Sequence, residues 1–208
     1  MNDFALKARA ALGGVLVTGR HGRAGGSAGL VVRELINLSL ASVVARGGEV
    51  DTLLTLAKNA YGLDLPLMPR RVSTLLSDGR HVAFAWAGPA QWLAIRDGID
   101  EFEPELVAAL GTRAMIAEQG DGRCVLRISG PKARQVLAKG LPIDVDPRVF
   151  KPGDVALSVA AHVNVHLWQL DDAPTYELSV MRSFAGSFWS WLQASAAEFG
   201  YEIADPRS

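Results

Sequence analysis

Two histidines in the segment HVNVH, His162 and His166, are the first residues whose types and spacing could do chemistry. On a helix, an i, i+4 pair of histidines faces one side and could bind zinc. The alternation of apolar and polar neighbours predicts a strand instead, with both histidines, Asn164 and Trp168 on one face. The two histidines then lie about 13 Å apart, too far to share a metal ion. Because no third ligand has a recognisable spacing, we expect no metal site.

Residues 124–144, CVLRISGPKARQVLAKGLPID, suggest a phosphate loop, because a strand meets a helix that opens with Lys132 and Arg134. A phosphate loop needs several backbone N–H groups that converge on the anion. This turn offers one glycine, followed by a proline that has no N–H. The Gly-Pro pair is typical of a helix start and Gly140 of a helix end, so we interpret the segment as a strand-to-helix corner.

The other candidate sites are also explained more simply by structure. Residues 19–26, GRHGRAGG, lack the spacing of a dinucleotide-binding loop and are typical of a flexible basic arm. Cys124 opens an apolar strand, which favours a buried structural thiol. Ser129 lacks the surroundings of a nucleophilic serine, and Asp171 and Asp172 lie in a predicted turn. We therefore assign no catalytic, cofactor-binding or metal-binding residue.

Composition and charge exclude several classes of function. The 208 residues include 21 basic and 22 acidic side chains, and this balance gives no electrostatic case for binding nucleic acid. The apolar runs are shorter than the roughly 20 residues that span a bilayer, so no membrane contact is expected. A single cysteine and an N-terminus without a signal-peptide pattern favour a soluble cytoplasmic protein.

The elements that must position these residues form two similar halves. We expect a flexible glycine-rich arm at residues 1–30 and one domain at 31–208, with halves at about 31–119 and 120–208. Each half is predicted to follow the order β-α-β-β-α-β, which gives an α+β fold with antiparallel sheets and helices packed on them. The predicted helices lie at 49–62, 102–110, 131–140 and 183–200.

The last predicted helix, SFAGSFWSWLQASAAEFG, carries aromatic side chains at helical spacing. One face is predicted to be core. Its members are Phe184, Phe188, Trp191, Leu192, Ser195 and Phe199. Trp189 lies off this face, and two interpretations stay open for it. An exposed Trp189 would be an anchor for a partner, whereas a covering loop would make it part of the core.

Several segments together resemble a known family. Residues 124–154, HVNVHLWQLDD and the last helix are similar to the gamma subunit of heterotetrameric sarcosine oxidase, and residues 42–66 and FAWAGPAQWLAI fit its N-terminal half. The resemblance implies a fold like the folate-binding domain of aminomethyltransferases. It also implies a complex with alpha, beta and delta subunits, in which the other subunits carry FAD, FMN, NAD and tetrahydrofolate and this chain binds no cofactor alone.

The resemblance implies a chain without catalytic residues of its own, in a complex that oxidises sarcosine to glycine. The products would be peroxide and either formaldehyde or methylene-tetrahydrofolate. We expect a subunit interface on this chain. The candidate interface residues are Trp189, His162, His166, Trp168, Lys132 and Arg134. Two alternatives stay open: the similar small subunit of N-methylglutamate dehydrogenase, and a free-standing folate-binding protein for one-carbon transfer.

Overall fold

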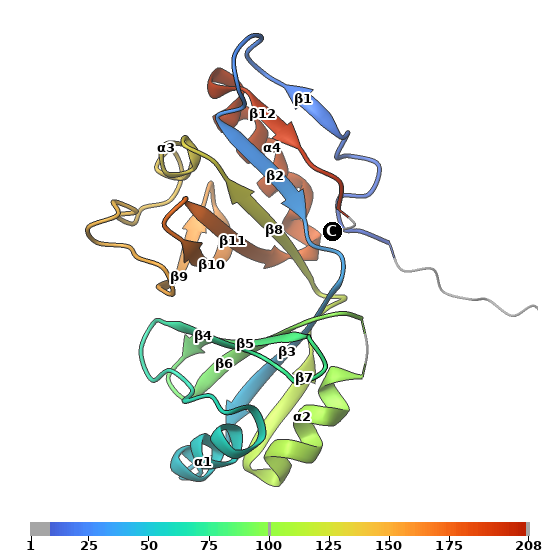
Figure 1. Cartoon of the computed structure of the whole chain (residues 1–208), viewed down its shortest axis with the longest axis vertical. Helices are drawn as coiled ribbons and strands as arrows, with labels where there is room; N and C mark the ends of the chain where they lie inside the picture. The colour runs from blue at the N-terminus through green and yellow to red at the C-terminus, as the bar shows by residue number, and fades with distance from the viewer. Residues whose placement is uncertain (1–8, 100, 207–208) are drawn as a thin grey trace, which may run out of the picture.

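The computed structural model describes residues 9–99 and 101–206, which fold into two β-sheets whose inner faces meet (Figure 1). Helices cover the outer face of each sheet, so the chain has four layers in the order α-β-β-α. The expected α+β class with mainly antiparallel sheets is confirmed. Within the described residues, no helix is both long and apolar enough to cross a bilayer.

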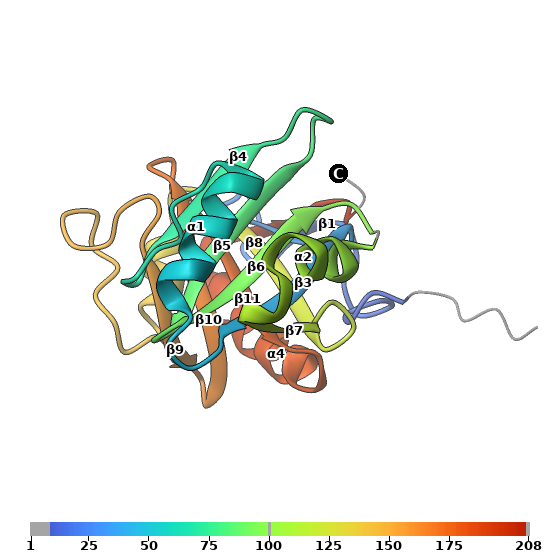
Figure 2. The same cartoon turned by 90° about the horizontal axis from the view of Figure 1, so that it is seen from below.

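The five-stranded sheet has the strand order β4-β5-β6-β3-β7 and is antiparallel throughout. Two helices, α1 and α2, lie side by side on its outer face (Figure 2). The elements are β3 (Leu38–Ala45), α1 (Val50–Tyr61), β4 (Arg71–Leu75), β5 (His81–Gly88), β6 (Gln91–Asp97), α2 (Phe102–Leu110), the 3₁₀ turn η1 (Gly111–Arg113) and β7 (Ala114–Glu118).

The seven-stranded sheet has the order β1-β12-β2-β8-β11-β10-β9, and only its β12–β2 pair is parallel. Its outer face packs against α3 and α4. The elements are β1 (Gly19–His21), β2 (Leu30–Glu34), β8 (Arg123–Ser129), α3 (Ala133–Leu137), β9 (Val155–Ala160), β10 (Val163–Asp171), β11 (Thr175–Met181), η2 (Arg182–Phe184), α4 (Ala185–Ala196), η3 (Ala197–Phe199) and β12 (Tyr201–Ile203).

The duplicated order of elements is longer than predicted. Each half follows β-α-β-β-β-α-β, from β3 to β7 and from β8 to β12, so the expected β-α-β-β-α-β order lacks one strand. In the first half the strand without a prediction is β4, a five-residue edge strand directly after a proline-containing loop. None of its residues is fully buried, so its sequence has no strongly apolar face to indicate a strand.

The N-terminal segment contacts the domain at several points between residues 9 and 30, although most of its side chains are exposed, and this differs from the free arm expected at residues 1–30. The side chain of Leu12 is 1% exposed, and β1 pairs with β12. The backbone N–H of Gly29 donates to the carbonyl of Gly200, and a Cβ at Gly29 would lie 2.8 Å from Phe199. Residues 1–8 lie outside the described residues.

The boundary between the two halves also differs from the prediction. Strand β2 precedes β3 in sequence, yet it lies between β12 and β8 in the seven-stranded sheet. The chain therefore crosses from one sheet to the other twice, once between β2 and β3 and once between β7 and β8. These two crossings connect the sheets at one end.

The aromatic face of α4 is only partly as predicted. Phe188 and Leu192 are fully buried, whereas Phe184 is 53% exposed because it precedes the helix in η2. Trp189 is buried and packs edge-on against Tyr201 with ring centroids 5.9 Å apart. Strand β12 thus covers Trp189, and the interpretation of Trp189 as an exposed anchor is wrong for this chain.

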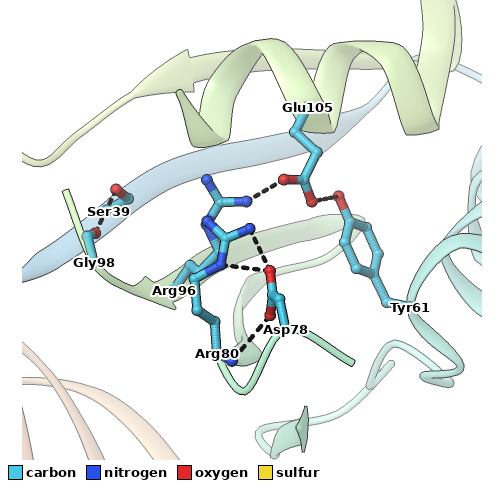
Figure 3. Close-up of polar contacts among 7 residues, drawn as sticks. All are labelled: Ser39, Tyr61, Asp78, Arg80, Arg96, Gly98 and Glu105. Atoms are coloured by element: carbon cyan, nitrogen blue, oxygen red, sulfur yellow. Dashed lines mark hydrogen bonds and ion pairs between the residues drawn. The ribbon is translucent and has the colours of Figure 1, made fainter. Parts of the chain in front are cut away.

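A buried arginine connects the five-stranded sheet to both of its helices (Figure 3). Arg96 on β6 is 1% exposed, donates to the Glu105 carboxylate on α2, and lies over the Phe102 ring at 4.3 Å from its centroid. Glu105 also accepts a hydrogen bond from the Tyr61 hydroxyl on α1, at 3.4 Å. Burial and the nearby carboxylate raise the pKa of Tyr61, which therefore stays a hydrogen-bond donor at neutral pH.

We expect the Glu105→Ala variant to be less stable than the wild type by about 2 kcal/mol, because it removes an anionic acceptor from a buried guanidinium. The free energy of unfolding in urea measures this loss. Glu103→Ala is the matched control, since Glu103 lies in the same helical turn and is expected to change stability by less than about 0.5 kcal/mol. Equal losses in the two variants would contradict a specific role for Glu105.

Candidate functional site: the inter-sheet cleft

The inner faces of the two sheets touch at one end and separate at the other. Leu40, Val155 and Trp168 belong to the apolar cluster that joins the sheets. Beyond this cluster, the side chains of the same faces line a cavity of about 670 Å³. On β3, for example, the lining residues are Ser42 and Val44, two and four positions after Leu40. We call this cavity the inter-sheet cleft.

The rim of the inter-sheet cleft is apolar and open to solvent. Leu157, Val159 and Met181 line it from the seven-stranded sheet, and they are 49%, 41% and 44% exposed. Half-buried Val44 lines it from the five-stranded sheet, where it pairs with the exposed Met115 of β7. Exposed aliphatic side chains along the rim of a cleft are typical of a surface that another molecule covers.

The floor of the inter-sheet cleft is polar, and its ionisable groups come from the seven-stranded sheet. His166 on β10 is 4% exposed, and its Nε2–H donates to the carbonyl of Trp86 on β5 at 3.0 Å. Burial, with a smaller contribution from the nearby Arg123 guanidinium, lowers the pKa of His166 to about 4. The imidazole is therefore neutral at pH 7 and acts as a hydrogen-bonded link between the sheets.

Arg123 at the start of β8 is the cation of the cleft. Its guanidinium donates to the hydroxyl of buried Ser179 at 3.4 Å, and burial lowers its pKa. Its Nε is buried and has no hydrogen-bond partner among the described residues. None of the described residues that line the cleft is Asp or Glu. The cleft therefore holds a positive charge that no carboxylate of its own walls compensates.

A buried carboxylate lies next to the cleft, on the side where the sheets touch. Glu177 on β11 is 3% exposed and accepts two hydrogen bonds from Arg127, at 2.9 and 2.6 Å. Its second oxygen accepts from Trp168 Nε1 at 2.6 Å. This group is satisfied within the chain, so we interpret it as a structural ion pair.

A second cavity, of about 340 Å³, lies near the crossings between the sheets. Its lining includes Arg9, Arg123 and Arg182 as well as Glu34, Glu118 and Asp121, so it contains both charges and shares Arg123 with the inter-sheet cleft. Cys124 is at its base, as buried as predicted, and its thiol donates weakly to Glu34 at 3.7 Å. Burial and this carboxylate raise the pKa of Cys124, which keeps the thiol protonated and unreactive.

Among the described residues, no group of three or more His, Cys, Asp or Glu side chains is arranged to hold a metal ion. The strand predicted for HVNVH is confirmed from Val163 onward as β10, with His166 and Trp168 on the face toward the other sheet. The expectation that His162 belongs to this strand is wrong. His162 precedes this strand in a two-residue turn with positive φ at Ala161 and His162.

The comparisons with known proteins all indicate the same family. The model of the sarcosine oxidase gamma subunit family matches residues 46–198. The chain belongs to this family. The gamma subunit of sarcosine oxidase from an Arthrobacter species is 31% identical over 177 residues, which cover 84% of each chain. The gamma subunit from Corynebacterium sp. strain P-1 is 33% identical over 136 residues, just under two thirds of either chain.

Solved structures support the family and the fold. A chain of heterotetrameric sarcosine oxidase from Corynebacterium sp. U-96, solved with pyrrole 2-carboxylate, superposes with a TM-score of 0.73 and 26% identity over 84% of this chain and 87% of that one. The aminomethyltransferase of the glycine cleavage system from Bartonella henselae superposes with a TM-score of 0.65 over 85% of this chain and 48% of that one. At 12% identity, this second likeness shows a shared fold alone.

The candidate interface residues of this gamma-family chain do not form one surface. His166 and Trp168 lie between the sheets, and Trp168 is fully buried. Lys132 and Arg134 lie at the start of α3, on the outer side of the seven-stranded sheet, together with buried Trp189 in the adjacent helix. His162 lies in the β9–β10 turn. Of this set, only His166 lines the inter-sheet cleft.

The structure adds residues that the sequence did not single out in the gamma-family chain. Arg123 and Ser179 come from neighbouring strands, and they line the cleft together with Asn164, which was already predicted to share a face with His166. The signal was present as alternation, because Arg123 and Arg127 are four residues apart and therefore lie on the same face of a mainly apolar β8. Alternation gives the face of a strand but does not show which strand lies opposite.

We expect the stability of the folded chain to fall as the pH is lowered from about 6.5 to about 4. In this range His166 is neutral in the folded state, while the unfolded chain, with its ordinary histidine pKa near 6.5, binds a proton. The unfolded state then binds more protons, so its free energy falls relative to the folded state. The maximum loss from this group is about 3 kcal/mol.

Urea unfolding at pH 7.0, 5.5 and 4.5 measures this effect as a difference between the wild type and His166→Gln. The wild type should lose more stability over this range than His166→Gln. His162→Gln serves as the control from the same segment, because its exposed side chain should leave the wild-type pH dependence unchanged. Identical pH profiles for the wild type and His166→Gln would contradict the low pKa of His166.

Proposed function

We propose that this chain acts as the gamma subunit within a heterotetrameric sarcosine oxidase, where its role is in assembly. The family match across residues 46–198 carries the proposal. The superposition on a chain of a heterotetrameric sarcosine oxidase, over 84% of this chain, supports it. The open, partly apolar inter-sheet cleft is a further observation in favour of a chain with partners.

In this proposal the partners are the alpha, beta and delta subunits, and the complex oxidises sarcosine. Sarcosine, oxygen and water give glycine, formaldehyde and hydrogen peroxide, or the one-carbon unit passes to tetrahydrofolate. FAD, FMN, NAD and tetrahydrofolate are carried by the other subunits. The single cysteine is a buried, protonated thiol, which suits a reducing compartment, so we place the complex in the cytoplasm.

The polar groups of this chain support a role in assembly more than in chemistry. The imidazole of His166 donates to a backbone carbonyl, and its low pKa makes it a poor general base at neutral pH. The thiol of Cys124 is held protonated beside Glu34. The buried Glu177 carboxylate is fully used by Arg127 and Trp168. These groups are therefore engaged in contacts within the fold, and the His166 contact joins the two sheets.

Affinity purification of the tagged chain from its native host, followed by native mass spectrometry, tests the proposal. We expect a complex in which this chain is present with three other polypeptides, together with sarcosine-dependent formation of hydrogen peroxide. Removal of this chain should prevent the other three from forming the complex. Two results together would show that the proposal is wrong. The chain would purify alone as a stable monomer, and cells from which it has been deleted would oxidise sarcosine normally.

Calorimetry of the isolated chain with tetrahydrofolate separates this function from that of a free-standing folate-binding protein. We expect no measurable heat of binding up to millimolar ligand. Tight binding to the isolated chain would favour folate binding instead. The purified complex is then assayed with sarcosine and with N-methylglutamate. The amine that it oxidises distinguishes sarcosine oxidase from N-methylglutamate dehydrogenase.

A further inference from the structure

The inter-sheet cleft has the features of a contact surface for an acidic and apolar segment. Its rim consists of Leu157, Val159 and Met181, which are between 41% and 49% exposed. A cleft bordered by exposed aliphatic side chains loses unfavourable contact with water when another apolar surface covers it. The floor behind this rim is polar, so an apolar occupant alone would leave polar groups without hydrogen bonds.

The charge of the floor specifies what the occupant carries. Arg123 is the cation of the cleft, and its Nε is buried without a hydrogen-bond partner among the described residues. His166 is neutral at pH 7 and adds no charge. Since no Asp or Glu is among the described lining residues, covering the cleft with an apolar surface would bury the positive charge of Arg123 without a carboxylate partner on the cleft side. A carboxylate on the occupant removes this cost and can accept two hydrogen bonds from a guanidinium.

The position of the cleft in the fold suggests the shape of the occupant. Leu157 and Val159 belong to β9, the last strand of the seven-stranded sheet. Beyond its start, where the Val155 N–H donates to the Pro69 carbonyl, the outer side of β9 has no neighbouring strand among the described residues. Strands at the edge of a sheet are frequent contact sites for extended segments of another protein. The cleft runs along the same strand and is about 670 Å³ in volume, which suits several side chains of such a segment.

From these observations we infer that the inter-sheet cleft receives an extended segment of a partner subunit, in which a carboxylate side chain is flanked by aliphatic residues. The carboxylate pairs with Arg123, and the aliphatic residues cover Leu157, Val159 and Met181. The inference rests on the proposed function, because it assigns the surface through which this chain contacts its partner in the complex.

Hydrogen–deuterium exchange compares the isolated full chain with the purified complex. We expect slower exchange in the complex for the backbone amides of β9 and of residues 163–166 and 179–181. The amides of residues 73–75, at the end of edge strand β4 that is away from β9, do not line the cleft, so they serve as an internal reference and should change much less. Unchanged exchange along β9 in an intact complex would overturn the inference.

Variants of the chain test the two components of the surface separately. Arg123→Gln and Leu157→Asp should each weaken binding of the partner subunits by roughly tenfold or more, because one removes the charge and the other the apolar contact. Arg46→Gln is the control for the charge, since Arg46 is exposed and outside the cleft. Leu75→Asp is the control for the apolar contact, because Leu75 is 60% exposed at the end of edge strand β4.

The salt dependence of assembly gives a readout that a folding defect would not produce. Binding of the wild-type chain should weaken as the salt concentration rises, and Arg123→Gln should show a smaller dependence. Thermal melting of each isolated variant shows that it is folded. If Arg123→Gln does not fold, Leu157→Asp and the exchange experiment on the wild type still decide the result.

Other outcomes assign the cleft differently and would overturn the inference. If the isolated chain forms a concentration-dependent dimer that Leu157→Asp abolishes, the cleft binds a second copy of the chain. If the isolated chain binds benzoate, and Arg123→Gln loses this binding but assembles normally, the cleft binds a small carboxylate. If the wild-type chain does not assemble with partner subunits at all, the proposed function is wrong as well. This outcome is distinguishable, because it is measured on the wild type before any variant is made.

Discussion

The contact between the inner faces of the two sheets is the interaction on which the rest of the structure depends. At its centre, Trp168 is fully buried and donates to Glu177, whose other oxygen accepts two hydrogen bonds from Arg127. A carboxylate in this position is stable only because its acceptor sites are filled, and the filling groups fix the ring of Trp168. The ring then packs against the aliphatic side chains of the facing sheet, such as Leu40 and Leu93.

The inter-sheet cleft follows from where the sheets are connected. The two chain crossings hold them at one end, and the backbone at Arg71 and Gly153 joins β4 to the start of β9 through a hydrogen bond of 2.7 Å. An ion pair between Arg70 and Asp154 strengthens that second connection. Beyond the Trp86–His166 hydrogen bond, the described contacts no longer bring the inner faces together. The side chains there are exposed because the sheets separate.

The sequence predicted the elements better than their assembly. Alternation identified HVNVH as a strand and Cys124 as buried, since both properties depend on near neighbours. It could not predict that β2 joins the second sheet, because strand pairing is decided by contacts distant in sequence. Trp189 shows the same limit: its helical position was known, but β12, which covers it, is placed by tertiary packing.

The two walls of the cleft differ in a way that restricts what can cover them. The ionisable groups, Arg123 and His166, come from the seven-stranded sheet, whereas the five-stranded sheet contributes Val44, Leu93 and uncharged polar groups. A purely apolar surface would pack well against the wall of the five-stranded sheet, but it would remove the water that hydrates the Arg123 guanidinium on the other wall. A fully charged surface would be solvated better outside the cleft. Only an occupant with both characters would satisfy both walls, so the asymmetry of the two sheets would make the proposed contact surface selective.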